Sequence, residues 1–267
     1  MTTRRRLTGL SRSIEDRIAI VTGAASGMGR ATAHLFADEG ARVVVADLDR
    51  ERVDAVVDEI TAVHGDGVAS GIVCDVADHA QLRSLVDRTV AWAGRIDIVV
   101  NNAGGQFPSP AQHISPNGFL AVVKNNLVGT FHVCREVANQ HMIAAKRGRI
   151  VNVIANIYRG FPGMAHTGAA RAGVENLTMS LAVEWAQFGI LVNAIAPGVI
   201  LSSGTAQYPA EILQRAITQT PVKRAGTVDE VAAAIIFLAG PAAQFITGTT
   251  LRMDGGQALW GNTWEIP

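Results

Sequence analysis

Seven short runs of apolar, largely β-branched residues recur along the chain, and segments long enough to form helices separate them. The runs are residues 18–22, 43–46, 71–74, 96–101, 150–154, 190–195 and 250–253. They are apolar throughout instead of alternating with polar residues, which indicates strands covered on both faces. Strands that alternate with helices predict a parallel sheet. We therefore expect an α/β fold: a doubly wound sheet of about seven parallel strands with helices on both faces.

The length of 267 residues suits one large α/β domain as well as two small ones. No repeat or low-complexity linker interrupts the pattern, so we expect one domain over residues 17–267, preceded by a flexible N-terminal tail, residues 1–16. The least regular stretch, about residues 202–220, follows the sixth run and is expected to form a mobile lid over a substrate.

The charge balance argues against nucleic acid and anionic membranes as partners, because 23 Lys and Arg residues face 23 Asp and Glu residues. No segment has enough uninterrupted apolar residues to span a bilayer. Cys74 and Cys134 lie far apart inside apolar runs, which predicts neither a disulfide framework nor a metal cluster. We expect no metal and a reducing, cytoplasmic location.

A glycine-rich turn joins the first strand to the first helix in "IAIVTGAASGMGRATAHLFADEG". Gly23 permits the tight turn, Gly27 allows the backbone to approach a pyrophosphate, and Gly29 lets the helix pack closely on the strand. Ser26 and Met28 lie in the same turn, where unpaired N–H groups of the helix start can bind phosphates. This context predicts a dinucleotide-binding site of the Rossmann type.

Asp47 ends the second strand about twenty residues after the glycine-rich turn. Its carboxylate can accept hydrogen bonds from both ribose hydroxyls of NAD and would repel the 2′-phosphate of NADP. NAD(H) is therefore favoured. NADP(H) stays possible because Arg30 and Arg50 are close in the sequence.

Further motifs follow in a fixed order: "CDV" at 74–76, "NNAG" at 101–104, "NNLVGTF" at 125–131, "PGVI" at 197–200 and "DGG" at 254–256. With the glycine-rich turn, these motifs resemble the short-chain dehydrogenase/reductase family over almost the whole chain. The resemblance implies that Asn126 belongs to the active site. It also implies cofactor contacts by Asp75, Val76, Asn102, Ala103, Gly104, Pro197, Gly198 and Ile200. The alternative is that the asparagines only cap turns and strand ends.

Most members of that family use a Tyr-x-x-x-Lys pair, but the matching positions in "AHTGAARAGVENLT" hold Thr167 and Arg171. Spaced four apart, they would share one helix face and could both point at a cofactor. A threonine hydroxyl is too weak an acid for efficient general catalysis. Arg171 can bind ribose hydroxyls and supply a fixed positive charge. His166 could titrate, although a structural role is the alternative.

The chain has only two tyrosines. Tyr158 follows the fifth strand and is a candidate proton donor, with a surface role as the alternative, and Tyr208 lies in the expected lid. Within the family, "NNAGGQFPSPAQHIS" and "HTGAARAGVENLTMSLAVEWA" resemble the enoyl-CoA and dienoyl-CoA reductases, including peroxisomal trans-2-enoyl-CoA reductases. Resemblance to the enoyl-CoA and dienoyl-CoA reductase branch implies that the catalytic tyrosine can move from the helix to the end of the fifth strand.

The replaced pair favours reduction of a C=C bond in a 2-enoyl thioester, because an enolate oxygen needs hydrogen-bond donors and charge more than a tuned acid. Catalytic candidates are Tyr158, Thr167, Arg171 and Asn126, and the substrate would be an acyl-CoA-like small molecule. Alternatives are an alcohol or ketone dehydrogenase with an atypical acid, and a non-catalytic nucleotide-binding scaffold. The resemblance also implies a dimer or tetramer paired through helices at 131–142 and 169–184.

Overall fold

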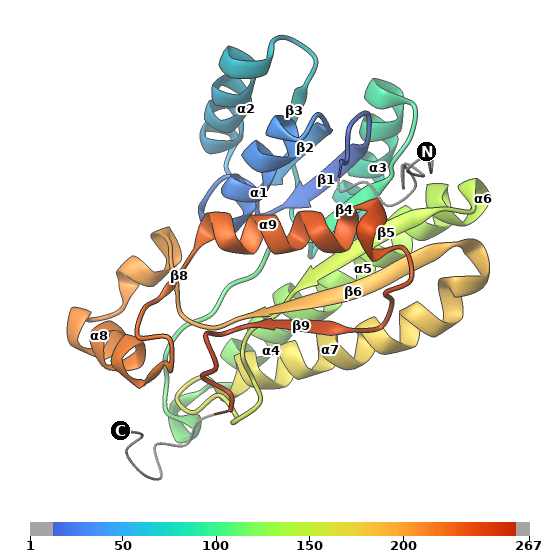
Figure 1. Ribbon diagram of the computed structural model, residues 1–267. Coiled ribbons are helices and arrows are strands. Elements are labelled where there is room, and N and C mark those ends of the chain that lie inside the picture. The colour runs from blue at the N-terminus through green and yellow to red at the C-terminus, as the bar shows by residue number, and fades with distance from the viewer. Residues whose placement is uncertain (1–12, 260–267) are drawn as a thin grey trace, which may run out of the picture.

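Seven parallel strands form the central sheet of the computed structural model, which describes residues 13–259 (Figure 1). Their order across the sheet is β3 (Ala69–Val73), β2 (Arg42–Asp47), β1 (Ile18–Thr22), β4 (Ile98–Asn101), β5 (Gly148–Val153), β6 (Ile190–Pro197) and β9 (Thr250–Met253). All neighbouring strands pair in parallel. The predicted sheet is confirmed. Each run expected from the sequence begins and ends within two residues of the corresponding strand.

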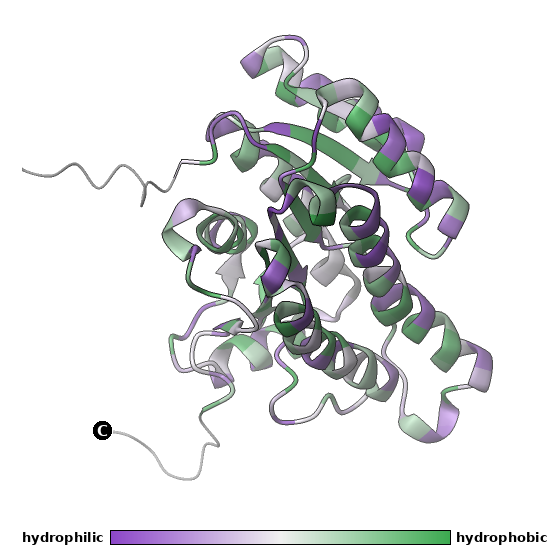
Figure 2. Ribbon diagram, turned by 90° about the vertical axis from the view of Figure 1, so that its right-hand side faces the viewer, coloured by the Kyte–Doolittle hydropathy of each residue, from purple (hydrophilic) through white to green (hydrophobic). Residues whose placement is uncertain are grey.

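Helices cover both faces of the sheet and enclose one apolar core on each side. The first face carries α1 (Gly27–Asp38), α2 (Arg50–His64) and α9 (Val228–Ala239). The opposite face carries α3 (His79–Ala93), α5 (Gly129–Val137) and α7 (Ala165–Trp185). Figure 2 shows hydrophobic strands in the centre and hydrophilic residues on helix surfaces turned away from the sheet. Burying each large apolar side chain contributes about 1.5–3 kcal/mol, and this apolar pattern explains why the sequence predicts the fold.

Local side-chain contacts determine where several of these helices begin. The Asp49 carboxylate accepts a hydrogen bond from the Arg52 N–H at the start of α2. The Asp78 carboxylate accepts bonds from two N–H groups at the start of α3. Thr227 and Glu230 form a reciprocal capping box at the start of α9. These contacts satisfy N–H groups that lack partners inside the helix.

The remaining elements connect the layers. They are α4 (Pro116–Val123), α6 (Ile143–Ala145), α8 (Ala210–Gln219), the small strand pair β7 (Ile200–Leu201) and β8 (Gly226–Thr227), π-helical turns at Lys124–Val128 and Ala138–Met142, and 3₁₀ turns at Ala111–His113, Ala186–Phe188, Ser203–Gln207 and Pro241–Ala243. The expected helices at 131–142 and 169–184 correspond to α5 with its following π turn, and to α7.

Two segments differ from the sequence-based expectation. Residues 1–12 of the expected tail lie outside the described residues. The next residues are part of the folded domain, because Ile14 is fully buried and the Asp16 N–H donates to the Gly40 carbonyl at 3.0 Å. The expected lid is more regular than its sequence suggests, since it contains the Ser203–Gln207 turn and α8.

Within residues 13–259, no helix combines the length and the apolar composition needed to cross a bilayer. The same residues contain no group of three or more His, Cys, Asp or Glu side chains that could bind a metal ion.

Candidate active site

One large cavity of about 1000 Å³ opens along the carboxyl ends of the parallel strands. Its walls include Gly23 after β1, Asp47 at the end of β2, Asn102 after β4 and Ile154 after β5. The strand order reverses between β1 and β4, and this reversal leaves a crevice in which doubly wound folds bind nucleotides. The sheet topology therefore determines where the site lies.

The glycine-rich turn provides the floor of the cavity. Gly23 has a φ of 62°, and a Cβ placed on it would lie 2.8 Å from the Ala103 Cα. A Cβ on Gly29 would collide with the Gly23 carbonyl. Ser26, which precedes α1, makes no capping hydrogen bond with its side chain, and the first turn of α1 has no acidic residue. The N–H groups at this helix start thus remain available to an anionic group such as a pyrophosphate.

Thr22 and Asn102 connect the glycine-rich turn to the loop after β4. The Thr22 hydroxyl oxygen accepts hydrogen bonds from the N–H groups of Asn102 and Ala103, both at 3.1 Å. The Asn102 side-chain amide donates to the carbonyls of Thr22 and Gly23 at 3.1 and 2.9 Å. These bonds fix two walls of the cavity relative to each other, which gives Asn102 a structural role there.

The Asp47 carboxylate faces the cavity and is oriented by backbone donors. One oxygen accepts from the Ala25 N–H at 3.0 Å, and the other accepts from the Leu48 N–H at 2.7 Å. A carboxylate has about four acceptor positions, so both oxygens retain capacity for ligand hydroxyls. The geometry suits the paired hydroxyls of a ribose.

Most of the cofactor-binding candidates named from the sequence line this cavity. They are Gly23, Ser26, Gly27, Met28, Asp47, Asp75, Val76, Asn102, Ala103, Gly104, Arg171, Pro197, Gly198 and Ile200. Gly29 does not line the cavity. It lies behind the turn, where its missing side chain permits the close approach of α1 to Gly23.

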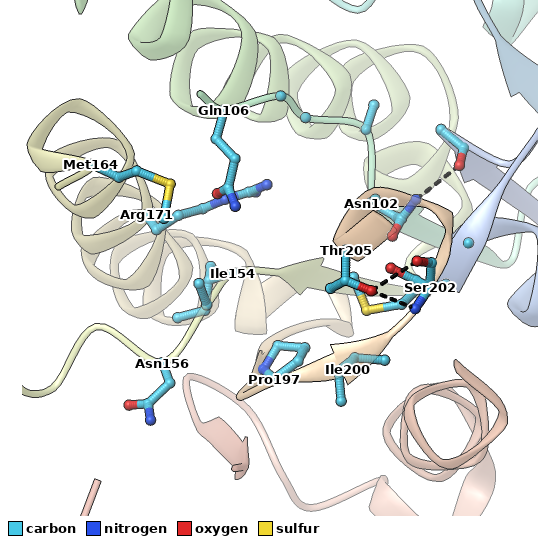
Figure 3. Close-up of a pocket in the computed structure, with 18 of the residues that line it drawn as sticks. Asn102, Gln106, Ile154, Asn156, Met164, Arg171, Pro197, Ile200, Ser202 and Thr205 are labelled. Carbon is cyan, nitrogen blue, oxygen red and sulfur yellow. Dashed lines mark hydrogen bonds between the residues drawn. The ribbon is translucent and has the colours of Figure 1, made fainter. Parts of the chain in front are cut away.

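Arg171 is the one buried cation in the cavity wall among the described residues. Its side chain comes from α7, is only 9% exposed, and donates from Nη1 to the Val153 carbonyl at 2.7 Å. Burial lowers the pKa of the guanidinium to about 10, and no described carboxylate pairs with it. Figure 3 shows its side chain extending from α7 into the cavity. Arg171 therefore brings an uncompensated positive charge to the site.

Asn126 lies close to this charge, in the π-helical turn between α4 and α5. Its side-chain N–H₂ donates to the carbonyls of Gly105 and Val122 at 2.7 and 2.8 Å, while its buried Oδ1 has no partner among the described residues. A Cβ on Gly104 would collide with both the Arg171 guanidinium and the Asn126 Oδ1. Asn126 is thus adjacent to the cavity wall, although it does not itself line the cavity.

Thr167 and His166 are fully buried and do not line the cavity. The Thr167 N–H donates to His166 Nδ1 at 2.8 Å, and the Thr167 hydroxyl lies 3.3 Å from the same nitrogen. The Phe107 ring packs edge-on against the imidazole. The predicted shared helix contains both Thr167 and Arg171, but only Arg171 is long enough to reach the cavity from it.

Tyr158 also lies outside the cavity lining. Its hydroxyl donates to a Glu175 carboxylate oxygen at 2.7 Å, and the Arg252 guanidinium stacks 3.7 Å from its ring centroid. Burial and the Glu175 carboxylate raise the pKa of the Tyr158 hydroxyl. The candidate acid chosen from the sequence is therefore engaged elsewhere, because the loop after β5 turns its side chain toward α7 and β9.

Two residues of the cavity wall are not among the site residues expected from the sequence. Gln106 has no sequence motif of its own, and Tyr208 was expected only as part of the lid. Gln106 follows "NNAGG" directly, and its side-chain amide donates to the Tyr208 hydroxyl at 2.8 Å. Both residues line the cavity. The available signal for Tyr208 was its position in the expected lid, but the pairing with Gln106 joins residues 102 positions apart and has no local signature.

Comparisons with known proteins agree with this geometry. A family model described as "Enoyl-(Acyl carrier protein) reductase" matches residues 23–258. The (2S)-[(R)-hydroxy(phenyl)methyl]succinyl-CoA dehydrogenase subunit BbsD of Thauera aromatica is 38% identical, over 92% of this chain and 98% of that protein. A probable 2,4-dienoyl-CoA reductase of Bacillus subtilis is also 38% identical, over 92% and 98% of the two chains.

Among solved structures, the citronellol catabolism dehydrogenase of Pseudomonas aeruginosa PAO1 superposes with a TM-score of 0.82 at 42% identity, covering 93% of this chain and all of that one. The family model covers the glycine-rich turn and all the segments that line the cavity. The comparisons support an oxidoreductase that binds NAD(P)(H) and acts on a small molecule. The chain belongs to the short-chain dehydrogenase/reductase family.

Proposed function

We propose that this enzyme reduces the C=C bond of a 2-enoyl thioester, such as an enoyl-CoA, with a reduced nicotinamide cofactor. The observation that carries the proposal is the buried Arg171 guanidinium, which lines the cavity without a carboxylate partner among the described residues. A buried cation destabilises a protein unless something compensates it. A substrate that becomes negatively charged during the reaction would supply that compensation.

The chemistry of guanidinium matches this type of substrate. Nicotinamide, when bound, supplies a hydride to the β-carbon, and the electrons of the C=C bond move to the thioester oxygen as an enolate. Arg171 can donate hydrogen bonds to that oxygen and offset its charge while keeping its own protons. One such preorganised donor is worth about 3–4 kcal/mol of transition-state stabilisation. Thr167, a candidate from the sequence, would act only indirectly, because its hydroxyl faces His166.

For the cofactor we propose NAD(H). The Asp47 carboxylate faces the cavity, where it would repel a 2′-phosphate. Arg30 donates to Glu59 at 2.9 and 2.6 Å, and Arg50 donates to Asp54 at 3.3 Å, so neither arginine is free to offset that repulsion. The cofactor contacts proposed are those of the cavity-lining candidates, with Gly29 supporting the turn.

The test compares 2-enoyl-CoA substrates of increasing length with the corresponding 3-ketoacyl-CoA compounds, each with NADH and with NADPH. We expect kcat/KM to be larger for the enoyl series and for NADH. Faster turnover of the 3-ketoacyl series would refute C=C reduction. Tight NADH binding without turnover of any substrate would instead support a scaffold.

A second candidate is the interconversion of an alcohol and a ketone. BbsD and the citronellol catabolism protein are both named as dehydrogenases. Tyr208 also places a phenolic hydroxyl in the cavity. Oxidation of 3-hydroxyacyl-CoA by NAD⁺, measured beside the reductive assays, distinguishes this candidate.

We also propose a cytoplasmic homo-oligomer, a dimer or tetramer, paired through α5 and α7. Apolar side chains remain exposed on these helices: Phe131 (38%), Met179 (46%) and Val183 (80%). Light scattering of the purified protein tests this, and a monomeric mass at micromolar concentration would contradict it.

A further inference from the structure

The proposed reaction needs a proton as well as a hydride, and Arg171 is unsuited to supply it. Its proposed role is to bind the substrate oxygen as a fixed cation, and it can fill that role only while it keeps its own protons. Cys74 lines the cavity, but burial raises the pKa of its thiol to about 12. The remaining hydroxyl groups in the described cavity wall belong to Ser26, Ser202, Ser203, Thr205 and Tyr208. A phenol is a much stronger acid than an aliphatic alcohol.

The Tyr208 hydroxyl lies at the same end of the cavity as Arg171. It accepts a hydrogen bond from the Gln106 side-chain amide at 2.8 Å, and it lies 3.7 Å from the Met164 sulfur. Figure 3 shows Gln106, Met164 and Arg171 in one part of the cavity view. Gln106 is two residues from Gly104, and a Cβ on Gly104 would collide with the Arg171 guanidinium. The 104–106 loop therefore links the Tyr208 hydroxyl to the wall of the cavity that holds Arg171.

The hydrogen bonds of Tyr208 leave its proton available. The Gln106 amide donates, so it occupies a lone pair of the phenol oxygen and not its O–H. Within the described part of the chain, that O–H has one acceptor, the Met164 thioether at 3.7 Å, which is a weak one. An incoming substrate atom could replace the sulfur with little loss. Tyr158 contrasts with this, because its O–H is bound to the Glu175 carboxylate outside the cavity.

We propose that Tyr208 is the catalytic acid of this enzyme, supplied by the segment that covers the substrate. In the reaction under "Proposed function", on which this inference rests, the Tyr208 O–H bond breaks as a C–H bond forms at the substrate α-carbon. The electron pair of the enolate forms that bond, and the phenolate left behind takes a proton from water. With a ketone substrate, the same O–H would protonate the alkoxide oxygen.

If Tyr208 is the acid, proton transfer depends on the expected lid, residues 202–220, which carries this tyrosine. Tyr208 directly follows the Ser203–Gln207 turn, which Thr205 stabilises by accepting from the Ser202 N–H and donating to the Ser202 carbonyl. Proton transfer would then require this segment in the position seen here, so the acid enters the site only when the substrate is covered.

The test compares Tyr208→Phe with Tyr158→Phe in the full-length protein, using whichever substrate the wild type reduces fastest. For Tyr208→Phe we expect kcat to fall at least 100-fold, while NADH affinity and KM change less than threefold. The solvent deuterium isotope effect on kcat should also differ between Tyr208→Phe and the wild type. A kcat within threefold of wild type would overturn the assignment, and a large loss confined to Tyr158→Phe would favour the sequence-based candidate.

A second measurement does not depend on turnover. Tyr158→Phe leaves Tyr208 as the only tyrosine, so phenolate absorbance reports on it alone. With NAD⁺ present, acetoacetyl-CoA as the probe should shift that titration if the ligand contacts Tyr208, and an unchanged titration at saturating probe would overturn the proposal. If the wild type reduces ketones and Tyr208→Phe lowers that kcat, only the proposal of C=C reduction is refuted. If the wild type reduces enoyl thioesters and Tyr208→Phe keeps its kcat, only the acid assignment is refuted.

Discussion

Replacing Arg171 with methionine should separate the catalytic role of the buried charge from its effect on folding. Methionine fills a similar space without the guanidinium. Losing a preorganised donor to the developing oxyanion should raise the barrier by about 3–4 kcal/mol. At 1.4 kcal/mol per factor of ten, this is roughly a 100- to 1000-fold loss of kcat/KM.

The stability change should be much smaller, because two effects oppose each other. Burial lowers the pKa of Arg171 from 12.5 to about 10. Since the charged form is disfavoured in the fold, this shift destabilises the protein below that pH, by about 3 kcal/mol at 1.4 kcal/mol per pKa unit. Removing the charge relieves this penalty. Losing the bond to the Val153 carbonyl costs about 1–3 kcal/mol, so the two contributions nearly offset.

The assay measures steady-state reduction of crotonyl-CoA and thermal unfolding in parallel, with Arg171→Lys as the matched control that keeps a cation without the planar fork. We expect Lys to retain more activity than Met, and both variants to unfold within a few degrees of wild type. If Arg171→Met keeps kcat/KM within threefold of wild type while Tm is unchanged, the charge has no catalytic role.

Further changes test other parts of the structure. Asp47→Ser should raise KM for NADH and narrow the preference over NADPH, because the group that would repel the 2′-phosphate is removed; an unchanged ratio of kcat/KM values would place the ribose elsewhere. Gly104→Ala should lower activity by displacing the neighbouring guanidinium, with circular dichroism expected to show an intact fold. Cys74 and Cys134 are buried thiols with pKa values raised to about 12, so they should react with a disulfide reagent at pH 8 only after unfolding, and rapid labelling of the native protein would contradict this. Phe36→Ala, in the fully buried core, should lower the free energy of unfolding by about 3–5 kcal/mol, as measured by urea denaturation.

Local signals in the sequence were enough for the sheet and for the part of the cavity wall at the carboxyl ends of its first strands. The apolar runs, the glycine-rich turn and Asp47 each depend on residues adjacent in the chain, and parallel strands bring their carboxyl ends to one edge. This is why residues named from motifs, such as Asn102 and Pro197, line one cavity. Burial of apolar runs and backbone geometry at glycines act over a few residues, so they leave a readable pattern.

The rest of the cavity wall depended on contacts that no local pattern records. Helix spacing placed Thr167 and Arg171 on one face, but side-chain length and the packing of His166 determined that only Arg171 reaches the cavity. Tyr158 and Tyr208 could not be ranked from the sequence, because Glu175 and Gln106 meet their hydroxyls only in the folded chain. The sequence by itself determined the fold, and the edge of the sheet along which the cavity opens, through short-range periodicity and the glycine-rich turn. Tertiary structure alone decided which polar groups face the rest of the cavity, because each depends on where a distant loop or helix brings its partner.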